Sequence, residues 1–291
     1  MSRLFVAIQY LIPHQAFSRL VGWFMSVRLW KALLIGFFIR RYGVDLSEAE
    51  REQAADYESF NDFFTRRLKS DARPFPDHPQ AILCPADGTV SQAGELNDEL
   101  LLQAKGHEFS CADLLADTRL ARQFSNGSFA TVYLSPRDYH RVHMPFTGRL
   151  TTMTYVPGRL FSVNPTTTAA VPGLFARNER VVCHFDTEIG PMAVVLVGAM
   201  IVASIDTVWA GTVCPGQRGT VTTDYTNQAT PVILQRGDEL GLFKTGSTVI
   251  VLFAKGAATM APGFDAGLSV RMGQTKATNN TAAAESLTPS S

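Results

Sequence analysis

Clustered cysteines are missing from this sequence, and so are repeats and internal linkers. The four cysteines, Cys84, Cys111, Cys183 and Cys214, stand far apart. They therefore suggest neither a disulfide framework nor the short ligand spacing of a zinc site, and we expect no metal. No Gly/Ser linker divides the 291 residues, and 46% of them are hydrophobic. This favours a single catalytic domain with appended terminal segments.

Acidic residues are missing from the first forty-four positions. The segment carries +6, and the remaining twenty bases and twenty-six acids give −6. Bulky apolar residues separate its bases, but its longest apolar stretch, residues 32–39, is far short of the roughly eighteen that span a membrane. We expect residues 1–44 to form amphipathic helices at the membrane interface, attracted by anionic lipids. A helical hairpin packed on the protein itself is the alternative.

Nucleic-acid binding is not expected, because the basic residues of 1–44 alternate with bulky apolar residues and the rest of the chain is net acidic. The apolar run 193–205 is short and rich in β-branched residues, which favours a buried strand over a membrane span. We therefore expect a peripheral protein on the cytoplasmic side of the membrane.

The remaining pattern predicts an α+β protein with a β-rich core at 45–273. Ser59 with Asp62 is a capping box that starts a helix to about Arg67, and Ser110 with Asp113 starts another. Short β-branched runs and turns fill the middle of the chain. Residues 274–291 hold almost no bulky apolar side chain, so we expect a disordered tail.

The pair Gly246-Ser247 precedes an apolar, strand-like run at 249–253. Ser247 Oγ could attack the Gly246 carbonyl and convert the amide to an ester. β-Elimination of that ester would leave dehydroalanine and, after loss of ammonia, a pyruvoyl group. The motif alone is weak, because a serine needs a base and the base needs an orienting group.

Two segments offer such groups. Asp87-Gly88 marks a turn, where Asp87 could equally bond its own backbone. Ser135, Pro136 and Asp138 predict a capped helical turn that would place His140 and His143 on one face. These histidines could also be a solvated polar turn or a pair of metal ligands.

Together these segments resemble the prokaryotic-type phosphatidylserine decarboxylases, which are pyruvoyl-dependent proenzymes. The similar blocks follow one another over nearly the whole chain: NDFFTRRL (61–68), PADG (85–88), QAKGH (103–107), YLSPRDYHRVHMP (133–145), YVPGRLFSVN (155–164), FARNERV (175–181), TVWAG (207–211), FKTGST (243–248) and SVRMG (269–273). One departure is Thr245, where many members carry an aliphatic residue.

The resemblance implies conversion of phosphatidylserine to phosphatidylethanolamine and CO₂ through a Schiff base, in phospholipid biosynthesis. It implies a self-processing triad of Asp87, His143 and Ser247, and cleavage between Gly246 and Ser247 into a larger β and a smaller α chain. These would form a heterodimer, with further dimerisation left open, and the smaller chain would hold one or two strands and the tail. Ser247 would become the covalent pyruvoyl cofactor, and His140 is the proposed proton donor.

Arg137, Arg141, Arg177, Asn178 and Arg180 are candidates for holding the substrate anion, although each also suits a structural role. By resemblance, Ser162 and Asn164 line the pocket. Two other classes remain open. A membrane-associated Ser-His-Asp lipid hydrolase is one, although Gly246-Ser247 lacks the Gly-x-Ser-x-Gly elbow. A non-enzymatic β-rich module with structural histidines is the other.

Overall fold

The structure is a computed structural model that describes residues 9, 25, 30–76, 78–79, 81–103, 107–200, 204–213, 219–244 and 247–279. Most of the basic segment 1–44 therefore lies outside the described residues. The described part is β-rich with few helices, which confirms the α+β class.

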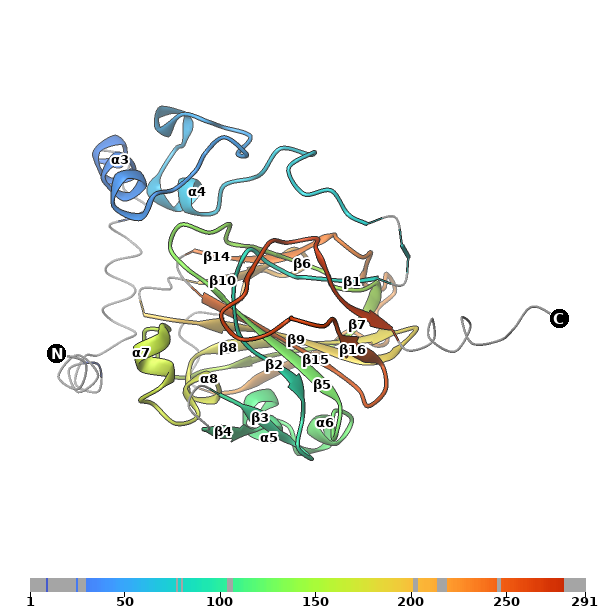
Figure 1. The fold of residues 1–291 in the computed structure, drawn as a ribbon. Coiled ribbons are helices and arrows are strands. Elements are labelled where there is room, and N and C mark those ends of the chain that lie inside the picture. The colour runs from blue at the N-terminus through green and yellow to red at the C-terminus, as the bar shows by residue number, and fades with distance from the viewer. Residues whose placement is uncertain are drawn as a thin grey trace.

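A nine-stranded antiparallel sheet forms the centre of the molecule (Figure 1). Its order is β12 (Val221–Asp224), β7 (Gly148–Val156), β8 (Arg180–Thr187), β9 (Gly190–Gly198), β15 (Ser247–Phe253), β5 (Ser128–Leu134), β2 (Gly88–Glu95) and β17 (Ser269–Val270), and β13 (Ile233–Leu234) also pairs with β7. All seven residues of β15 are buried. A continuous apolar run is typical of a strand covered on both faces, as this one is.

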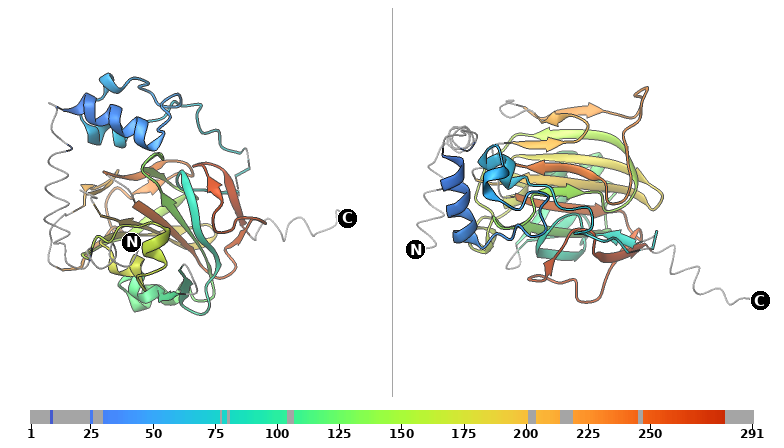
Figure 2. Two further views of the ribbon diagram at one scale, coloured as in Figure 1. Left: turned by 60° about the vertical axis from the view of Figure 1, so that its left-hand side comes forward. Right: turned by 90° about the horizontal axis from the view of Figure 1, so that it is seen from above.

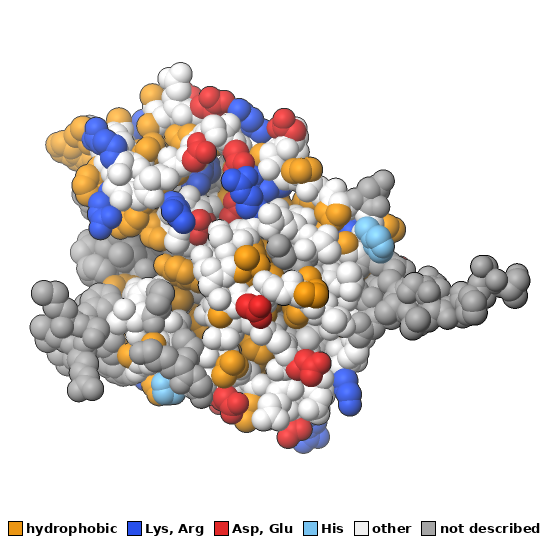
Figure 3. Space-filling view, viewed as in Figure 1, with side chains coloured by type: hydrophobic (Ala, Val, Ile, Leu, Met, Phe, Trp, Pro, Cys, Tyr) orange, Lys and Arg blue, Asp and Glu red, His pale blue; other side chains and the backbone are white. Residues whose placement is uncertain are grey.

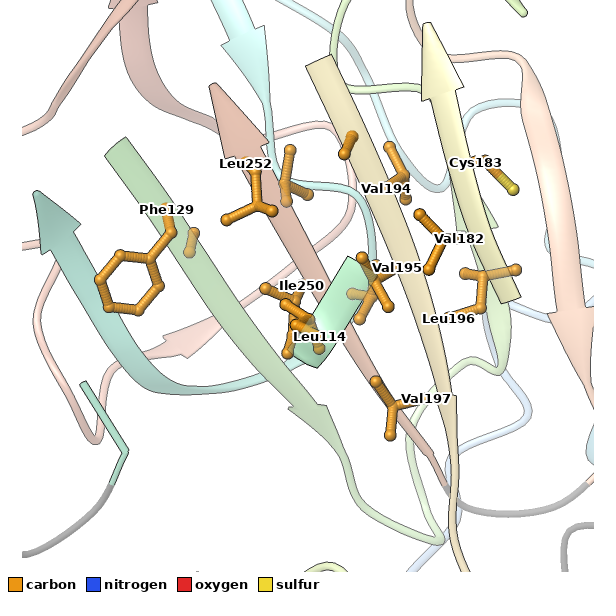
Figure 4. Close-up of a cluster of buried hydrophobic side chains, with 14 of the residues drawn as sticks. Leu114, Phe129, Val182, Cys183, Val194, Val195, Leu196, Val197, Ile250 and Leu252 are labelled. Carbon is orange, nitrogen blue, oxygen red and sulfur yellow. The ribbon is translucent and has the colours of Figure 1, made fainter. Parts of the chain in front are cut away.

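Different layers cover the two faces of this sheet (Figures 1 and 2). On one side lies a four-stranded sheet, β11 (Gly211–Thr212), β10 (Ile205–Thr207), β14 (Glu239–Phe243) and β6 (Arg141–His143). On the other side are α5 (Cys111–Leu115), α6 (Thr118–Arg122) and the hairpin of β3 (Leu100–Leu102) and β4 (Glu108–Ser110). Leu114 of α5 lies over Ile250 and Val195 of the central strands (Figure 4). The short helices α7 (Pro165–Thr168) and α8 (Leu174–Arg177) lie between β7 and β8 in the chain.

A separate three-stranded sheet corrects the expected boundary of the tail. Its order is β1 (Ala81–Leu83), β18 (Thr275–Asn279) and β16 (Ala258–Met260). The prediction of disorder from residue 274 is thus wrong for 275–279, because small Thr and Ala residues fit between two strands and Ala277 is buried. Residues 280–291 lie outside the described part. The segment after Gly246 therefore contributes four strands, β15 to β18, rather than one or two.

The N-terminal unit consists of α3 (Lys31–Tyr42), the 3₁₀ turn η1 (Ala54–Asp56) and α4 (Phe60–Phe64). Ile35 and Phe38 of α3 pack on the aromatic side chains of α4 as a second hydrophobic cluster. The Ser59 side chain accepts from the Asp62 amide, as predicted, and Ser110 caps α5 in the same way. Helix α4 ends before Arg67, the predicted end, because the Thr65 carbonyl binds Arg141 Nε at 2.9 Å instead of continuing the helix.

Candidate active site

Ser247 is the first residue of β15 and its side chain is fully buried. In the sheet it stands opposite Leu134 of β5 and Gly198 of β9. Among the described residues its hydroxyl has no hydrogen-bond partner, and the same is true of Thr248 Oγ1. Thr245 and Gly246 lie outside the described residues. A buried hydroxyl without a partner is costly, so neither Ser247 nor Thr248 gains stability from its hydroxyl in this arrangement.

His143 ends strand β6, and both of its ring nitrogens are bonded. Nδ1 lies 2.8 Å from the Gly237 carbonyl, which can only accept, so Nδ1 carries the proton. Nε2 therefore accepts from the Tyr139 hydroxyl, 3.0 Å away. Burial lowers the pKa of His143 below its ordinary value. His143 is thus a neutral base whose lone pair at Nε2 is held by Tyr139.

Asp87 lies in the turn before β2 and belongs to a network of charges. Its carboxylate accepts two bonds from the Arg73 guanidinium and one from the Met272 amide at 2.8 Å. Arg73 also binds Glu48 at 2.9 Å, and Glu48 binds Arg271 at 2.6 Å. The network therefore connects the N-terminal unit, the Asp87 turn and the segment after Gly246.

The structure brings the three expected triad residues into neighbouring segments without bonding them to one another. The His143 amide donates to the Pro85 carbonyl at 2.8 Å, which fixes the Asp87 turn beside β6. In the described residues, however, Gly237 and not Asp87 holds His143 Nδ1, and Ser247 Oγ is free of both. The three side chains are thus near one another in the fold but do not form a hydrogen-bonded triad in this structure.

His140 is fully buried, and Nδ1 is bonded to the Asp138 carbonyl at 2.8 Å. Its ring packs on Phe64 with centroids 3.9 Å apart, and Nε2 has no described partner. Burial, together with the charge of Arg66, lowers the pKa of His140 to about 3. The side chain is therefore neutral near pH 7, with a free lone pair at Nε2.

The prediction that His140 and His143 share the face of a helical turn is wrong. Residues 136–138 form a turn closed by Asp138 N to Ser135 O at 2.9 Å, but the chain then extends into β6. Pairing of β6 with β14 stabilises this extended backbone. Residues an odd number apart on extended backbone point to opposite sides, and the two histidines accordingly have different neighbours.

Two cavities lie at the end of the central sheet where β15 begins. One, of about 250 Å³, lies between α3, α4 and residues that include Tyr133, Ser162 and Ala199. The other, of about 380 Å³, is lined by residues that include Tyr133, Val163 and Asn164. Tyr133 pairs with Thr248, and Ala199 follows the partner of Ser247, so both cavities lie close to the serine. Ser162 lines the first of these cavities and Asn164 the second.

Most of the predicted anion-binding candidates have structural roles. Arg180 donates all its guanidinium nitrogens to backbone carbonyls, and Asn178 bonds to Phe161 and Gly198. Arg141 forms an ion pair with Glu239 at 2.6 Å. The side chain of Arg137 is 66% exposed.

Sequence reasoning missed Tyr139, Gly237 and Arg73 as partners of the site, as well as Arg66, a buried arginine two residues after α4. The sequence signal that could have identified two of them is their place in family-like blocks, Tyr139 in residues 133–145 and Arg66 in residues 61–68. In the part of the chain that the structure describes, no three His, Cys, Asp or Glu side chains gather as metal ligands would.

Comparison with known proteins gives matches that together cover most of the chain. A family model described as phosphatidylserine decarboxylase matches residues 60–278, and a second, described as PSD, matches 4–43. The chain belongs to the phosphatidylserine decarboxylase family. The chain is 58% identical to the phosphatidylserine decarboxylase proenzyme of Pseudomonas paraeruginosa and 57% identical to that of Pseudomonas aeruginosa PAO1. Each of these matches covers 94% of this chain and 96% of the relative. The Saccharophagus degradans proenzyme is 55% identical over 93% of the chain and 96% of its own length.

These relatives of the family give no support to the lipid-hydrolase alternative. Among the described helices, none combines the length and the apolar character needed to cross a membrane.

Proposed function

We propose that the chain is a self-processing, pyruvoyl-dependent phosphatidylserine decarboxylase that releases CO₂ and phosphatidylethanolamine. The observation that carries the proposal is the Ser247 hydroxyl, which is fully buried, lacks a described partner and stands at the head of the central strand. Membership of a family whose relatives are named proenzymes supports self-processing. A serine at this place fits the origin of a pyruvoyl group, because the new chain end would stay fixed by pairing on both sides of β15.

Self-processing begins with removal of the Ser247 hydroxyl proton. His143 Nε2 has the correct tautomer for this, since Gly237 holds the proton on Nδ1. Oγ then forms the ester with the Gly246 carbonyl as the peptide C–N bond breaks. Loss of the Ser247 α-proton expels the Gly246 carboxylate, and hydrolysis of the resulting enamine releases ammonia. Asp87 would stabilise the protonated His143 once its side chain turns from Arg73 toward the ring.

In the decarboxylation step, a pyruvoyl group derived from Ser247 would supply an electrophile for the substrate amine and, once joined to it, an electron sink for the pair left by the departing CO₂. The chain's own residues hold the lipid and return a proton to the α-carbon. His140 is the proposed donor, since its Nε2 is unpartnered and buried beside the cavity-lining Phe64. Because this ring is neutral without substrate, it must first take up a proton, and an anionic ligand near Arg66 would favour that.

The N-terminal unit supports peripheral attachment to an anionic membrane. Trp30, the N-cap residue of α3, is 56% exposed, and Leu33 and Phe37 of the helix are 70% and 60% exposed. Their spacing places the three along one helix face. Arg40 and Arg41 follow in the last turn. Figure 3 shows apolar and basic side chains side by side over this unit. Such a face suits insertion among headgroups.

Intact-mass spectrometry tests the proposed function. Wild-type protein should separate into fragments 1–246 and 247–291, the smaller one with a pyruvoyl-blocked end, and should release CO₂ from phosphatidylserine. Ser247→Ala should remain whole and inactive. Thr248→Val is the matched control, because it removes the neighbouring buried, unpartnered hydroxyl at nearly equal volume. Loss of cleavage in both variants alike, or an intact and active wild-type chain, would refute the proposal.

A further inference from the structure

Arg66 is the exception among the buried arginines of the described structure. The residue is only 4% exposed and its guanidinium lies over the Phe63 ring, yet Nε and Nη1 have no hydrogen-bond partner among the described residues and no described carboxylate forms an ion pair with it. By contrast, Arg73 pairs with Asp87 and Glu48, and Arg180 is saturated by carbonyls. A buried guanidinium with three unused N–H bonds is costly, which points to an anion that arrives from outside.

The position of Arg66 is set by the turn that also holds His140. Arg66 Nη2 donates to the carbonyls of Arg137 at 2.8 Å and Asp138 at 3.3 Å. The Asp138 carbonyl is the same one that holds His140 Nδ1. Arg66 and His140 are therefore tied to one carbonyl, each with unpartnered nitrogen atoms. Phe64, which packs on His140, lines the 250 Å³ cavity, and so does Pro136 of the same turn.

We propose that Arg66 binds the phosphodiester of the lipid headgroup through Nε and Nη1, an inference that rests on the proposed function. The substrate carries two anions, and they differ in fate. The carboxylate leaves as neutral CO₂, so a cation bound to it would stabilise the ground state more than the transition state and slow the reaction. The phosphodiester keeps its charge throughout, so a cation there strengthens binding without raising the barrier.

This assignment predicts a separation of KM from kcat. In the processed enzyme, Arg66→Gln should raise KM for phosphatidylserine about 10- to 100-fold, the range for a lost charge-assisted hydrogen bond, with kcat changed far less. Phosphatidylmethanol, a phosphodiester lipid with neither amine nor carboxylate, should inhibit wild type competitively. Its inhibition constant should rise in Arg66→Gln by the same factor, and Arg66→Lys should recover part of it.

Arg67→Gln is the matched control, because it removes an exposed charge at the position next to Arg66. It should leave the inhibition constant unchanged, which separates local binding from general attraction to an anionic surface. Fragment masses measured alongside show whether each variant still processes itself, so failure of the proposed function is distinguished from failure of this one. An inhibition constant unaffected by Arg66→Gln, with only kcat lowered, would overturn the assignment.

A merely structural Arg66 would lower thermal stability or processing and leave the inhibition constant of the processed fraction unchanged, which also overturns it. If neither variant folds, a crystal structure of the wild-type enzyme with phosphatidylmethanol decides the question. A phosphate oxygen within hydrogen-bond distance of Arg66 Nε or Nη1 supports the proposal, and a phosphate held elsewhere refutes it.

Discussion

At the scale of single residues, the resting site is defined by competing hydrogen bonds. Tyr139 occupies the His143 nitrogen that is proposed to act as base, and Arg73 occupies the Asp87 carboxylate. Each bond satisfies a buried polar group, yet each would have to break before the proposed triad could form. The expected rate of self-processing therefore depends on how firmly these partners hold.

Tyr139→Phe tests the first of these bonds. Without the hydroxyl, His143 Nε2 is free to accept the Ser247 proton, so self-cleavage should accelerate about 2- to 10-fold, the equivalent of one net hydrogen bond. The half-time of cleavage in newly synthesised protein measures this. Tyr133→Phe, which changes another tyrosine near β15, should keep the wild-type half-time. Slower cleavage in Tyr139→Phe would mean that the hydroxyl assists the reaction.

His140 gives a pH dependence of stability. Its pKa falls to about 3 in the folded chain from an ordinary value of about 6.5. Between these values the unfolded chain binds a proton and the folded chain does not, so stability is lost as pH falls below 6.5. From pH 7 to 5 this contributes about 2 kcal/mol to the loss of unfolding free energy.

Urea unfolding of the uncleaved Ser247→Ala chain measures this contribution. Adding His140→Asn keeps a donor toward the Asp138 carbonyl. It should make the decrease in unfolding free energy from pH 7 to 5 smaller by about 2 kcal/mol. His78 is exposed, so His78→Asn should leave the loss as it is. Parallel pH curves for His140→Asn and its parent would show that His140 is not the source.

At the scale of elements, local signals were predictable and long-range pairing was not. Ser59, Ser110 and the apolar run after Ser247 each act within a few residues, and each predicted element exists. The turn before His140 also carries a local helix signal, but the pairing of β6 with distant β14 overrides it. Likewise, β18 forms only because β1 and β16 lie on either side.

The same reasoning applies to the candidate site. Family blocks identified Ser247, His143 and Asp87 as residues of interest, whereas their partners depend on tertiary contacts. Gly237 reaches His143 from a turn ninety-four positions away, and no sequence pattern marks that carbonyl. Arg66 is distinguished only in the folded chain, where its buried Nε and Nη1 have no hydrogen-bond partner among the described residues.

The position of β15 predicts that the two cleavage fragments stay together. The strand pairs along its full length with β5 and β9, and Arg271 and Met272 add contacts to Glu48 and Asp87. After cleavage, both fragments should elute as one species in native size-exclusion chromatography and separate only in denaturant. The uncleaved Ser247→Ala chain provides the reference elution volume. Separation in native buffer would contradict this placement of β15.

At the scale of the whole molecule, the features that we propose to face the membrane lie at one end. The N-terminal unit lies above the β-sheets in Figure 1, whereas the β3–β4 hairpin lies at the opposite end. The cavity of about 250 Å³ is lined from both the N-terminal unit and the end of the central sheet. A lipid headgroup could therefore reach Ser247 while its acyl chains remain near the surface that α3 presents.

Replacing Trp30, Leu33 and Phe37 with serine should reduce binding to anionic vesicles by at least about tenfold, because three large side chains no longer enter the interface. Vesicle sedimentation measures this, with fragment masses as a check on folding. Leu100→Ser with Leu102→Ser is the control, since both residues are similarly apolar and partly exposed on the β3–β4 hairpin. If the control loses binding as strongly as the α3 variant, or neither loses it, α3 is not the surface that meets the membrane.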